Sequence, residues 1–258
     1  MPVNSVNTNV GAMIALQNLN KTNTDLQTTQ NRINTGLKVG SAKDDGAAFA
    51  IAQSQRSTVS SLDAVKDSLS RATSVVDVAS SAGESVSDML TQLKEKALAA
   101  SDTSLDSTSR SALKADFESI RDQITKTLTN ASFNGINLVD GSQTSVTALA
   151  NADGSSVLTV AAQNLSLGGS IVTLASDASF ATASSAGALL STLDSSINSV
   201  SAALAKLGTS SKAVDNHLEF VGKLQDSITA GIGNLVDADL AKESAKLQAL
   251  QTKQQLGI

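Results

Sequence analysis

Apolar residues recur at alternating steps of three and four along a stretch near the end of the chain, from Leu190 to Leu235. A period of 3.5 residues keeps an apolar seam facing one partner helix along its whole length, so the pattern predicts a long helix packed along another. At about 1.5 Å rise per residue this helix would extend on the order of 70 Å. Only Ser211 and Gln225 interrupt the seam, and single polar residues at such positions usually fix the register. The seam residues expected to pack the rod are Leu204, Leu207, Val214, Leu218, Val221, Ile228 and Leu235.

Two more rods are predicted in the first half of the chain. The same alternation runs from about Ala47 to Ala100, and after a polar break at residues 101–109 a third helix extends to Leu128. Gly83 lies on the seam, where it is expected to permit close helix approach at a cost of about 1 kcal/mol relative to Ala. The residues expected to pack these rods are Leu62, Leu69, Val76, Leu90, Leu93, Phe117 and Ile120.

Both ends of the chain carry apolar stripes that a single helix cannot cover. Helical spacing extends from Asn4 to about Thr35, and the remaining face there is mostly Asn, Gln and Thr. Beyond Leu235 the seam shifts by one residue, which predicts a joint at Asp237–Asp239. These helices are expected to order only against partners. The stripe residues expected to serve subunit assembly are Val6, Val10, Met13, Leu16, Leu19, Leu26, Ile33, Leu240, Leu247 and Leu250.

The pattern changes between Phe133 and Phe180, where turn signals separate short runs of strand composition. The runs are Val146–Leu149, Val157–Val160 and Ile171–Leu174, and they predict a small β-hairpin region with exposed Ser and Thr. The expected fold class is therefore mainly α, with long antiparallel helical rods formed by the N- and C-terminal segments. The predicted domains are residues 1–43 with 235–258, residues 44–132 with 181–234, and the hairpin region 133–180.

Composition narrows the function classes. Among the 258 residues Trp, Tyr and Cys are absent and Pro occurs once, which suits thin, unbroken helices and excludes disulfides and thiol chemistry. The net charge of -5 and the lack of a basic stripe argue against nucleic acid as the main partner. No run approaches the roughly 18 apolar residues of a membrane span. The first residues also lack the basic and apolar regions of a conventional secretory signal.

Candidate chemistry is weak throughout. Asp44-Asp45 and Asp237-Ala238-Asp239 could suggest a carboxylate pair and a metal site, but residues one or two apart on a helix diverge, so capping roles are expected. His217, the single histidine, is expected to be solvated or packed, because Asp215 and Glu219 lie two residues away on either side and face away. Gly231 and Gly233 are a fragment of a phosphate loop without its strand. No catalytic, cofactor-binding or metal-binding residue is therefore assigned.

Multi-residue motifs at both ends resemble those of the bacterial flagellins. Val6-Asn7-Thr8-Asn9 and the run from Arg32 to Lys38 occur in the family's order, followed by Ser41-Ala42-Lys43-Asp44-Asp45. Further matches are Phe133-Asn134-Gly135, Leu207-Gly208, Asn216-His217-Leu218-Glu219 and Asp237-Ala238-Asp239. Within the family the chain resembles the small Caulobacter-type flagellins that lack large outer domains.

The resemblance implies a structural subunit that polymerises head to tail into the extracellular flagellar filament and is not an enzyme. It implies an inner layer (D0) made by both chain ends and a rod layer (D1). It also implies unfolded export through the flagellar type III apparatus, no cofactor, and O-linked sugars on outward hydroxyls. The implied partners are other copies of the chain, an export chaperone, the filament cap and hook-associated proteins. The chain stops at Gly257-Ile258, before the family's usual apolar end helix, which implies an incomplete inner layer or a shortened sequence. The alternatives are a hook-filament junction protein or another coiled-coil assembly module.

Overall fold

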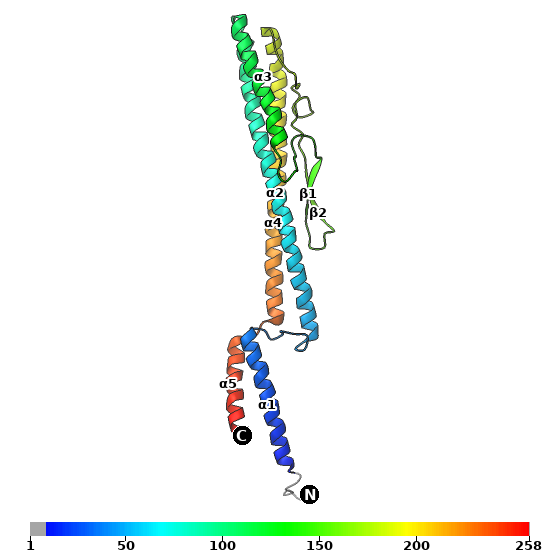
Figure 1. Cartoon of the computed structure of the whole chain (residues 1–258), viewed down its shortest axis with the longest axis vertical. Coiled ribbons are helices and arrows are strands. Elements are labelled where there is room, and N and C mark those ends of the chain that lie inside the picture. The colour runs from blue at the N-terminus through cyan, green and yellow to red at the C-terminus, as the bar shows by residue number, and fades with distance from the viewer. Residues whose placement is uncertain (1–8, 258) are drawn as a thin grey trace. The chain divides into compact units, whose positions relative to one another are not determined.

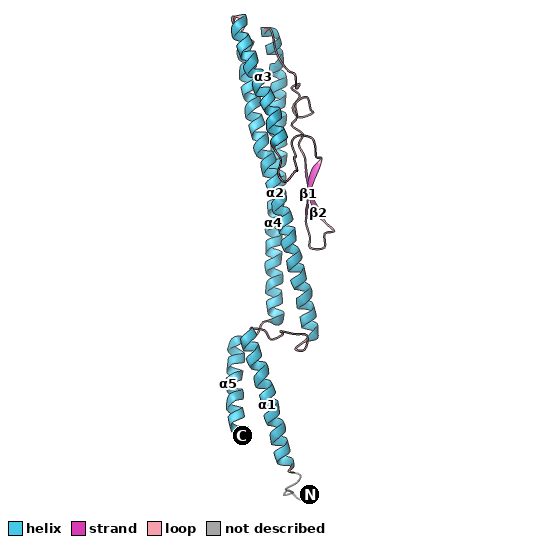
Figure 2. Ribbon diagram, viewed as in Figure 1, coloured by secondary structure: helices cyan, strands magenta, loops and turns pink. Residues whose placement is uncertain are grey.

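The computed structural model describes residues 9–257 and confirms a mainly α fold with a small β-hairpin (Figures 1 and 2). The helices are α1 (Val10–Thr35), α2 (Gly46–Ala100), α3 (Ser107–Asn130), α4 (Ala183–Val236) and α5 (Leu240–Gly257). The strands are β1 (Ser145–Leu149) and β2 (Val157–Ala161). The described residues group into a terminal unit, which runs up to Ser60 and resumes at Leu224, and a central unit, Ser61–Lys223.

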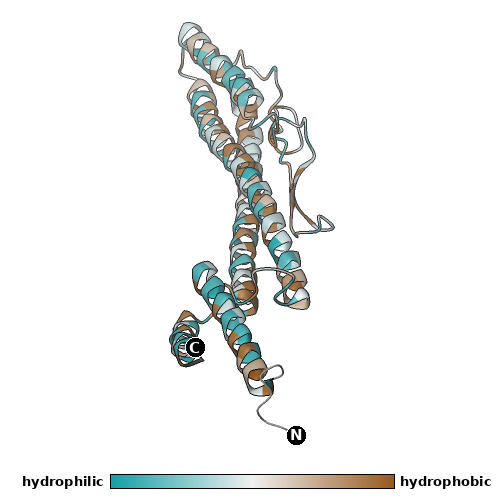
Figure 3. Ribbon diagram, turned by 60° about the horizontal axis from the view of Figure 1, so that its bottom comes forward, coloured by the Kyte–Doolittle hydropathy of each residue, from teal (hydrophilic) through white to brown (hydrophobic). Residues whose placement is uncertain are grey.

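The central unit buries one continuous apolar seam. α3 and the central part of α4 run beside α2, and hydropathy colouring shows hydrophobic residues recurring along these helices (Figure 3). Among the predicted packing residues, Ile120, Leu204 and Leu218 are half-buried. Those that are fully buried are Leu62, Leu69, Val76, Leu90, Leu93, Phe117, Leu207, Val214 and Val221.

At Gly83, side chains of α4 and of the hairpin region approach the α2 backbone closely. A Cβ built at Gly83 would lie 2.7 Å from Leu204 Cδ2 and 3.4 Å from Leu165 Cδ1. Carbon atoms in contact normally lie about 3.5–4.0 Å apart, so no side chain fits here without displacing a neighbour. The expected close approach at Gly83 is confirmed.

The hairpin region contains two strands where the sequence predicted three strand-like runs. β1 and β2 pair antiparallel, from Ser145 opposite Ala161 to Leu149 opposite Val157. The third run was wrongly predicted as a strand. Instead of joining a ladder, Thr173 donates its main-chain N–H to Ser196 Oγ on α4 at 3.1 Å. The alternating pattern still has a physical basis, because Val172 and Leu174 point inward and are buried.

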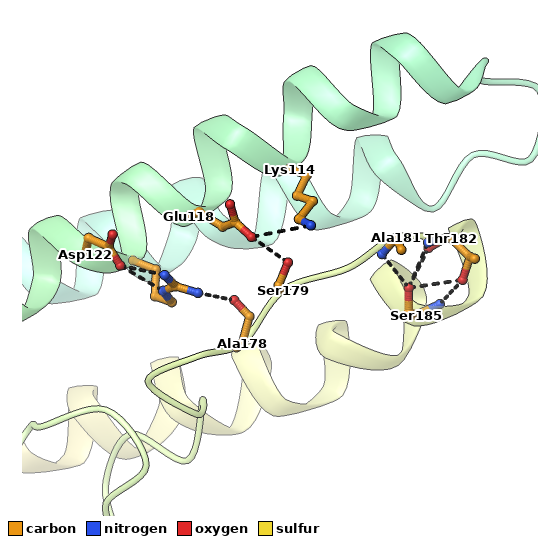
Figure 4. Close-up of polar contacts among 9 residues, drawn as sticks. Lys114, Glu118, Asp122, Ala178, Ser179, Ala181, Thr182 and Ser185 are labelled. Carbon is orange, nitrogen blue, oxygen red and sulfur yellow. Dashed lines mark hydrogen bonds and ion pairs between the residues drawn. The ribbon is translucent and has the colours of Figure 1, made fainter.

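Side chains at the loop ends of the central unit define where α3 and α4 begin. Asp106 caps α3 by accepting the Thr108 and Ser109 main-chain N–H groups at 2.8 and 2.9 Å. Thr182 and Ser185 cap α4 through a set of mutual contacts, including Ser185 N–H to Thr182 Oγ1 at 3.2 Å (Figure 4). α4 therefore starts at Ala183. The apolar seam from which this helix was predicted starts later, at Leu190.

Contacts with α3 hold the segment that leads into α4. Arg121 Nη1 donates to the Ala178 carbonyl at 2.8 Å, and Ser179 Oγ donates to Glu118 Oε1 at 2.7 Å (Figure 4). Beside them, the Phe117 and Phe180 rings meet edge to face with centroids 5.3 Å apart. Such aromatic pairs add about 0.5–1.5 kcal/mol beyond area burial, so this segment is fixed to the helices by both polar and apolar contacts.

Candidate assembly surface

The terminal unit contains the residues that the sequence predicted for assembly. Asn9 caps α1 by accepting the Ala12 N–H at 3.2 Å, and Gly36 ends α1 with a φ of 71°, which glycine adopts without strain. At the start of α5, Asp239 Oδ1 accepts the Ala241 and Lys242 N–H groups at 3.1 Å each. The capping role expected within Asp237–Asp239 is thus confirmed for Asp239.

The first turns of α1 expose large apolar side chains. Val10 is 65% exposed, Met13 66% and Leu16 60%. Ile14, which the spacing argument did not include, is 53% exposed. Figure 3 shows hydrophobic residues gathered near this end of α1. Neighbouring apolar side chains at this exposure mark an interaction surface on the helix.

The remaining predicted assembly residues are less exposed. Leu19, Leu26 and Ile33 on α1 are half-buried, as is Leu247 on α5. Leu240 is 50% exposed and Leu250 is buried. Val6 lies outside the described residues. The apolar stripes are therefore partly covered near the contact between α1 and α5, and most open toward the N-terminal end of α1.

The contact between α1 and α5 is itself polar to an extent that the sequence did not reveal. The buried residues of α1 are Thr22 and Thr29. Arg32 Nη1 pairs with Glu243 Oε1 at 3.1 Å, and Gln254 Nε2 donates to Asn23 Oδ1 at 2.7 Å. Pairing of positions more than 200 residues apart left no local signal in the sequence. Contacts within the chain therefore leave part of the apolar face of α1 exposed.

Main-chain hydrogen bonds connect the segment after α1 to the end of α4. Lys38 and Val39 donate their N–H groups to the Val236 carbonyl at 2.8 and 3.2 Å, and Ala238 donates to the Gly36 carbonyl at 2.8 Å. A small core lies beside these bonds, made by Val39, Ala52, Ile232 and Val236. The half-buried rod residues Ile228 and Leu235 pack against this core.

Asp44 and Asp45 organise the turn into α2. Asp45 Oδ1 accepts the Ala47 and Ala48 N–H groups at 3.0 Å each, so it caps the helix as expected. Hydrogen bonds from the Ser41 hydroxyl and the Ser41 main-chain N–H hold the pKa of Asp44 below its ordinary value. Both carboxylates accept hydrogen bonds from local donors near the start of a helix, so their role here is structural.

The side chains considered for chemistry have structural partners. His217 Nε2 lies 2.7 Å from the Ala150 carbonyl oxygen, and because a carbonyl only accepts, Nε2 must carry the proton. Within residues 9–257, no three His, Asp or Glu side chains converge as a metal site would require. No helix in the described part of the chain is both long and apolar enough to cross a membrane.

Two family models cover most of the sequence. "Bacterial flagellin N-terminal helical region" matches residues 6–144, and "Bacterial flagellin C-terminal helical region" matches residues 190–258. The chain belongs to the bacterial flagellin family. Flagellins build the extracellular filament of the bacterial flagellum, so this flagellin is a structural subunit of that filament.

Relatives of similar length support this assignment. Flagellin FljM of Caulobacter vibrioides is 58% identical over 258 residues, covering 100% of this chain and 93% of the relative. A flagellin of Brucella melitensis is 36% identical over 264 residues, covering 98% of this chain and 93% of the relative. The predicted similarity to small Caulobacter-type flagellins is confirmed.

Solved structures show the same fold at low sequence identity. A crystal structure of Bacillus cereus flagellin matches with a TM-score of 0.53 and 20% identity, covering 60% of this chain and 88% of that chain. A putative flagellar hook-associated protein from Vibrio parahaemolyticus matches with a TM-score of 0.62 and 15% identity, covering 75% of this chain and 100% of that chain. These two structures establish the likeness of fold alone.

Proposed function

We propose that this flagellin joins its neighbours head to tail through the apolar residues of its terminal helices. The single observation that carries the proposal is the exposure of Val10, Met13 and Leu16, between 60% and 66%, on a helix whose own buried residues are polar. Water is an unfavourable environment for such side chains, and a second copy of the chain offers equivalent stripes to cover them.

Contacts of this kind lead to an open polymer. When two different surfaces of one molecule meet and the rotation does not close a ring, addition continues without limit. Burying apolar area contributes about 25 cal/mol per Å², which must offset about 1–2 kcal/mol of ordering cost for each residue that becomes fixed. Several neighbours must therefore contribute at once, which favours addition at a filament end over free pairing in solution.

The proposed division of labour follows the predicted domains. Residues 1–43 with 235–258 form the inner layer, residues 44–132 with 181–234 form the rod layer, and the hairpin region 133–180 forms a small outer face. No Ser or Thr between residues 142 and 185 is buried, and exposed hydroxyls such as those of Ser170 and Ser176 are the ones we propose for O-linked sugars. The rod packing residues maintain the scaffold on which the terminal helices assemble.

Export and handling require partners that protect the same apolar faces. We propose secretion through the flagellar type III apparatus, with an export chaperone on the C-terminal segment and with filament cap and hook-associated proteins at the filament ends. Support comes from α5, where Leu240 is 50% and Leu256 83% exposed, because a chaperone groove accepts exposed apolar side chains of a helix.

A charge placed in the exposed stripe should block assembly. Leu16→Asp removes a side chain whose burial contributes about 1.5–3 kcal/mol and adds a carboxylate that a buried contact cannot solvate. We expect the critical concentration for elongation from filament seeds to rise at least about tenfold. Sedimentation of polymer and electron microscopy provide the measurement.

Two controls separate the alternatives. Gln17→Asp carries the same charge on the neighbouring exposed position, and it should elongate more readily than Leu16→Asp. Equal loss in both variants would contradict an apolar contact at Leu16. A hook-filament junction protein would add to seeds only briefly, whereas long continuous growth of the unmodified chain supports the filament subunit.

A further inference from the structure

Two polar contacts mark the interface of α1 with α5 near its opposite ends. Arg32 and Glu243 meet near the joint, and Asn23 and Gln254 meet farther along the antiparallel pair. Between these contacts few apolar side chains are fully covered, and Leu250 is the buried leucine of α5. Apolar packing alone therefore does little to fix the orientation of α5 along α1.

The segment between α4 and α5 fixes the position at which α5 begins, but it does not fix the direction of the helix axis. The main-chain bonds of Val236 and Ala238 hold the segment before α5, and Asp239 caps its first turn. Beyond that turn, no main-chain hydrogen bond joins α5 to another element in the described residues. The direction of α5 is left to side chains.

The Arg32 and Glu243 pair lies where charge has the greatest directional effect. Arg32 is in the last turn of α1 and Glu243 in the first turn of α5. Each charge therefore complements the dipole of its own helix as well as the other residue. Glu243 has 9% of its surface exposed, so a packing of α5 that buried this carboxylate away from Arg32 would leave it without a cation in a poorly hydrated position.

The pair is also incompletely satisfied, which favours a role in specificity over stability. Arg32 Nε and Glu243 Oε2 are buried with no hydrogen-bond partner, as is Thr29 Oγ1. Buried ion pairs contribute little net stability, whereas breaking one is costly because a bare charge remains. Buried polar residues of this kind are known to select one arrangement among several helical packings.

We infer that Arg32 and Glu243 are positioning residues that aim α5 along α1 and thereby decide which face of α1 stays open to neighbouring subunits. The inference rests on the proposed assembly through α1 and adds the element that orients the surface. Asn23 and Gln254 then report the direction of α5, because they meet only when the two helices run side by side.

The chain contains no cysteine, so an introduced pair reports this geometry without background. Asn23→Cys with Gln254→Cys is assembled into filaments and treated with a short thiol–thiol cross-linker. An intramolecular link appears as a shifted monomer band, and an intermolecular link as a ladder. The rate of intramolecular linking is compared in four backgrounds: unchanged, Glu243→Ala, Lys246→Ala, and Arg32→Glu with Glu243→Arg.

We expect Glu243→Ala to lower the linking rate at least about tenfold. Lys246→Ala, an exposed charge removed from the same helix, should leave the rate unchanged. The exchanged pair should regain part of the loss, because the ion pair re-forms although both charges now oppose their helix dipoles, and a merely structural role for either single side chain would not produce this recovery. An unchanged rate in Glu243→Ala, or no recovery in the exchanged pair, overturns the inference.

Variants that do not elongate alone are tested as a small tagged fraction within unmodified filaments. If the Glu243→Ala subunit does not enter even these mixed filaments, incorporation of the exchanged pair supports the inference. Exclusion of the exchanged pair while Lys246→Ala assembles overturns it. Failure of the proposed function looks different, because then even the unmodified chain gives no filaments.

Discussion

In the central unit, the space available to a side chain matters as much as its chemistry. Gly83→Ala should destabilise this unit, because the new Cβ would lie 2.7 Å from Leu204 Cδ2 and such overpacking costs about 1–3 kcal/mol. The better helix propensity of Ala returns about 1 kcal/mol or less. Gly208→Ala has no atom within 4 Å of the new Cβ and should instead stabilise by about 0.5–1 kcal/mol. Urea unfolding of the two variant monomers measures the contrast, and equal effects would refute the steric argument.

His217 is the second residue whose role can be tested alone. Its ring donates to the Ala150 carbonyl at 2.7 Å and thus ties the loop after β1 to α4. His217→Ala should cost about 0.5–1.5 kcal/mol for a lost hydrogen bond. It should also speed amide exchange in β1 and β2, whereas Asn216→Ala on the exposed side should not. Unchanged protection of the strands in His217→Ala would show that the loop is held by its other contacts.

At the scale of elements, the sequence predicted α2 and both observed strands to within a residue or two, but it also predicted a third strand that does not form. Seams with a period of 3.5 placed the ends of α2 within a residue or two, because each turn repeats the same signal. The third strand failed because the Thr173 N–H bonds to Ser196 on α4, a partner that local composition cannot indicate. α4 begins before its seam for a related reason, since Thr182 and Ser185 supply a cap that apolar spacing ignores.

Helix caps also make element stability depend on pH. The Ser109 main-chain N–H and hydroxyl hold the pKa of Asp106 below its ordinary value of 3.8. The ionised carboxylate therefore stabilises α3 above that value, and the contribution is lost as the pH falls through the lower folded pKa. Asp106→Asn keeps the acceptor but cannot titrate, so its melting temperature should fall less between pH 7 and pH 3 than that of the unchanged chain. Asp77→Asn, an exposed position on α2, should follow the unchanged chain; an Asp106→Asn curve parallel to it would refute this role.

At the scale of the whole molecule, the sequence predicted that the ends assemble but not how they are held. The apolar stripe on α1 was predicted from the spacing of its residues. Ile14 was missed because it is not at one of these regularly spaced positions. The polar contacts of Arg32 with Glu243 and of Asn23 with Gln254 join distant segments, so neither local pattern nor composition pointed to them. The small core around Val236 was likewise hidden, because it combines one loop with the ends of two long helices.

That small core predicts where order ends in the isolated subunit. Sequence alone placed the limits of the inner layer at residues 43 and 235, whereas the compact terminal unit reaches Ser60 and resumes at Leu224. The four buried apolar residues of the small core are few compared with the seam of the central unit. Since Val39 and Val236 connect α1 and α5 to the adjoining ends of α2 and α4, we expect the terminal unit to lose protection together.

Hydrogen exchange on dilute monomer and on filaments tests this boundary. In monomer, amides should exchange quickly up to about Ser60 and from about Leu224 onward, and slowly between them. In filaments, the described parts of both ends should become protected, because neighbouring copies cover the exposed stripe of α1. Fast exchange limited to the residues before 44 and after 235 would show that α2 and α4 stay ordered without the terminal helices. Slow exchange throughout the dilute monomer would show that the terminal unit is stable alone, and the argument for ordering by assembly would fail.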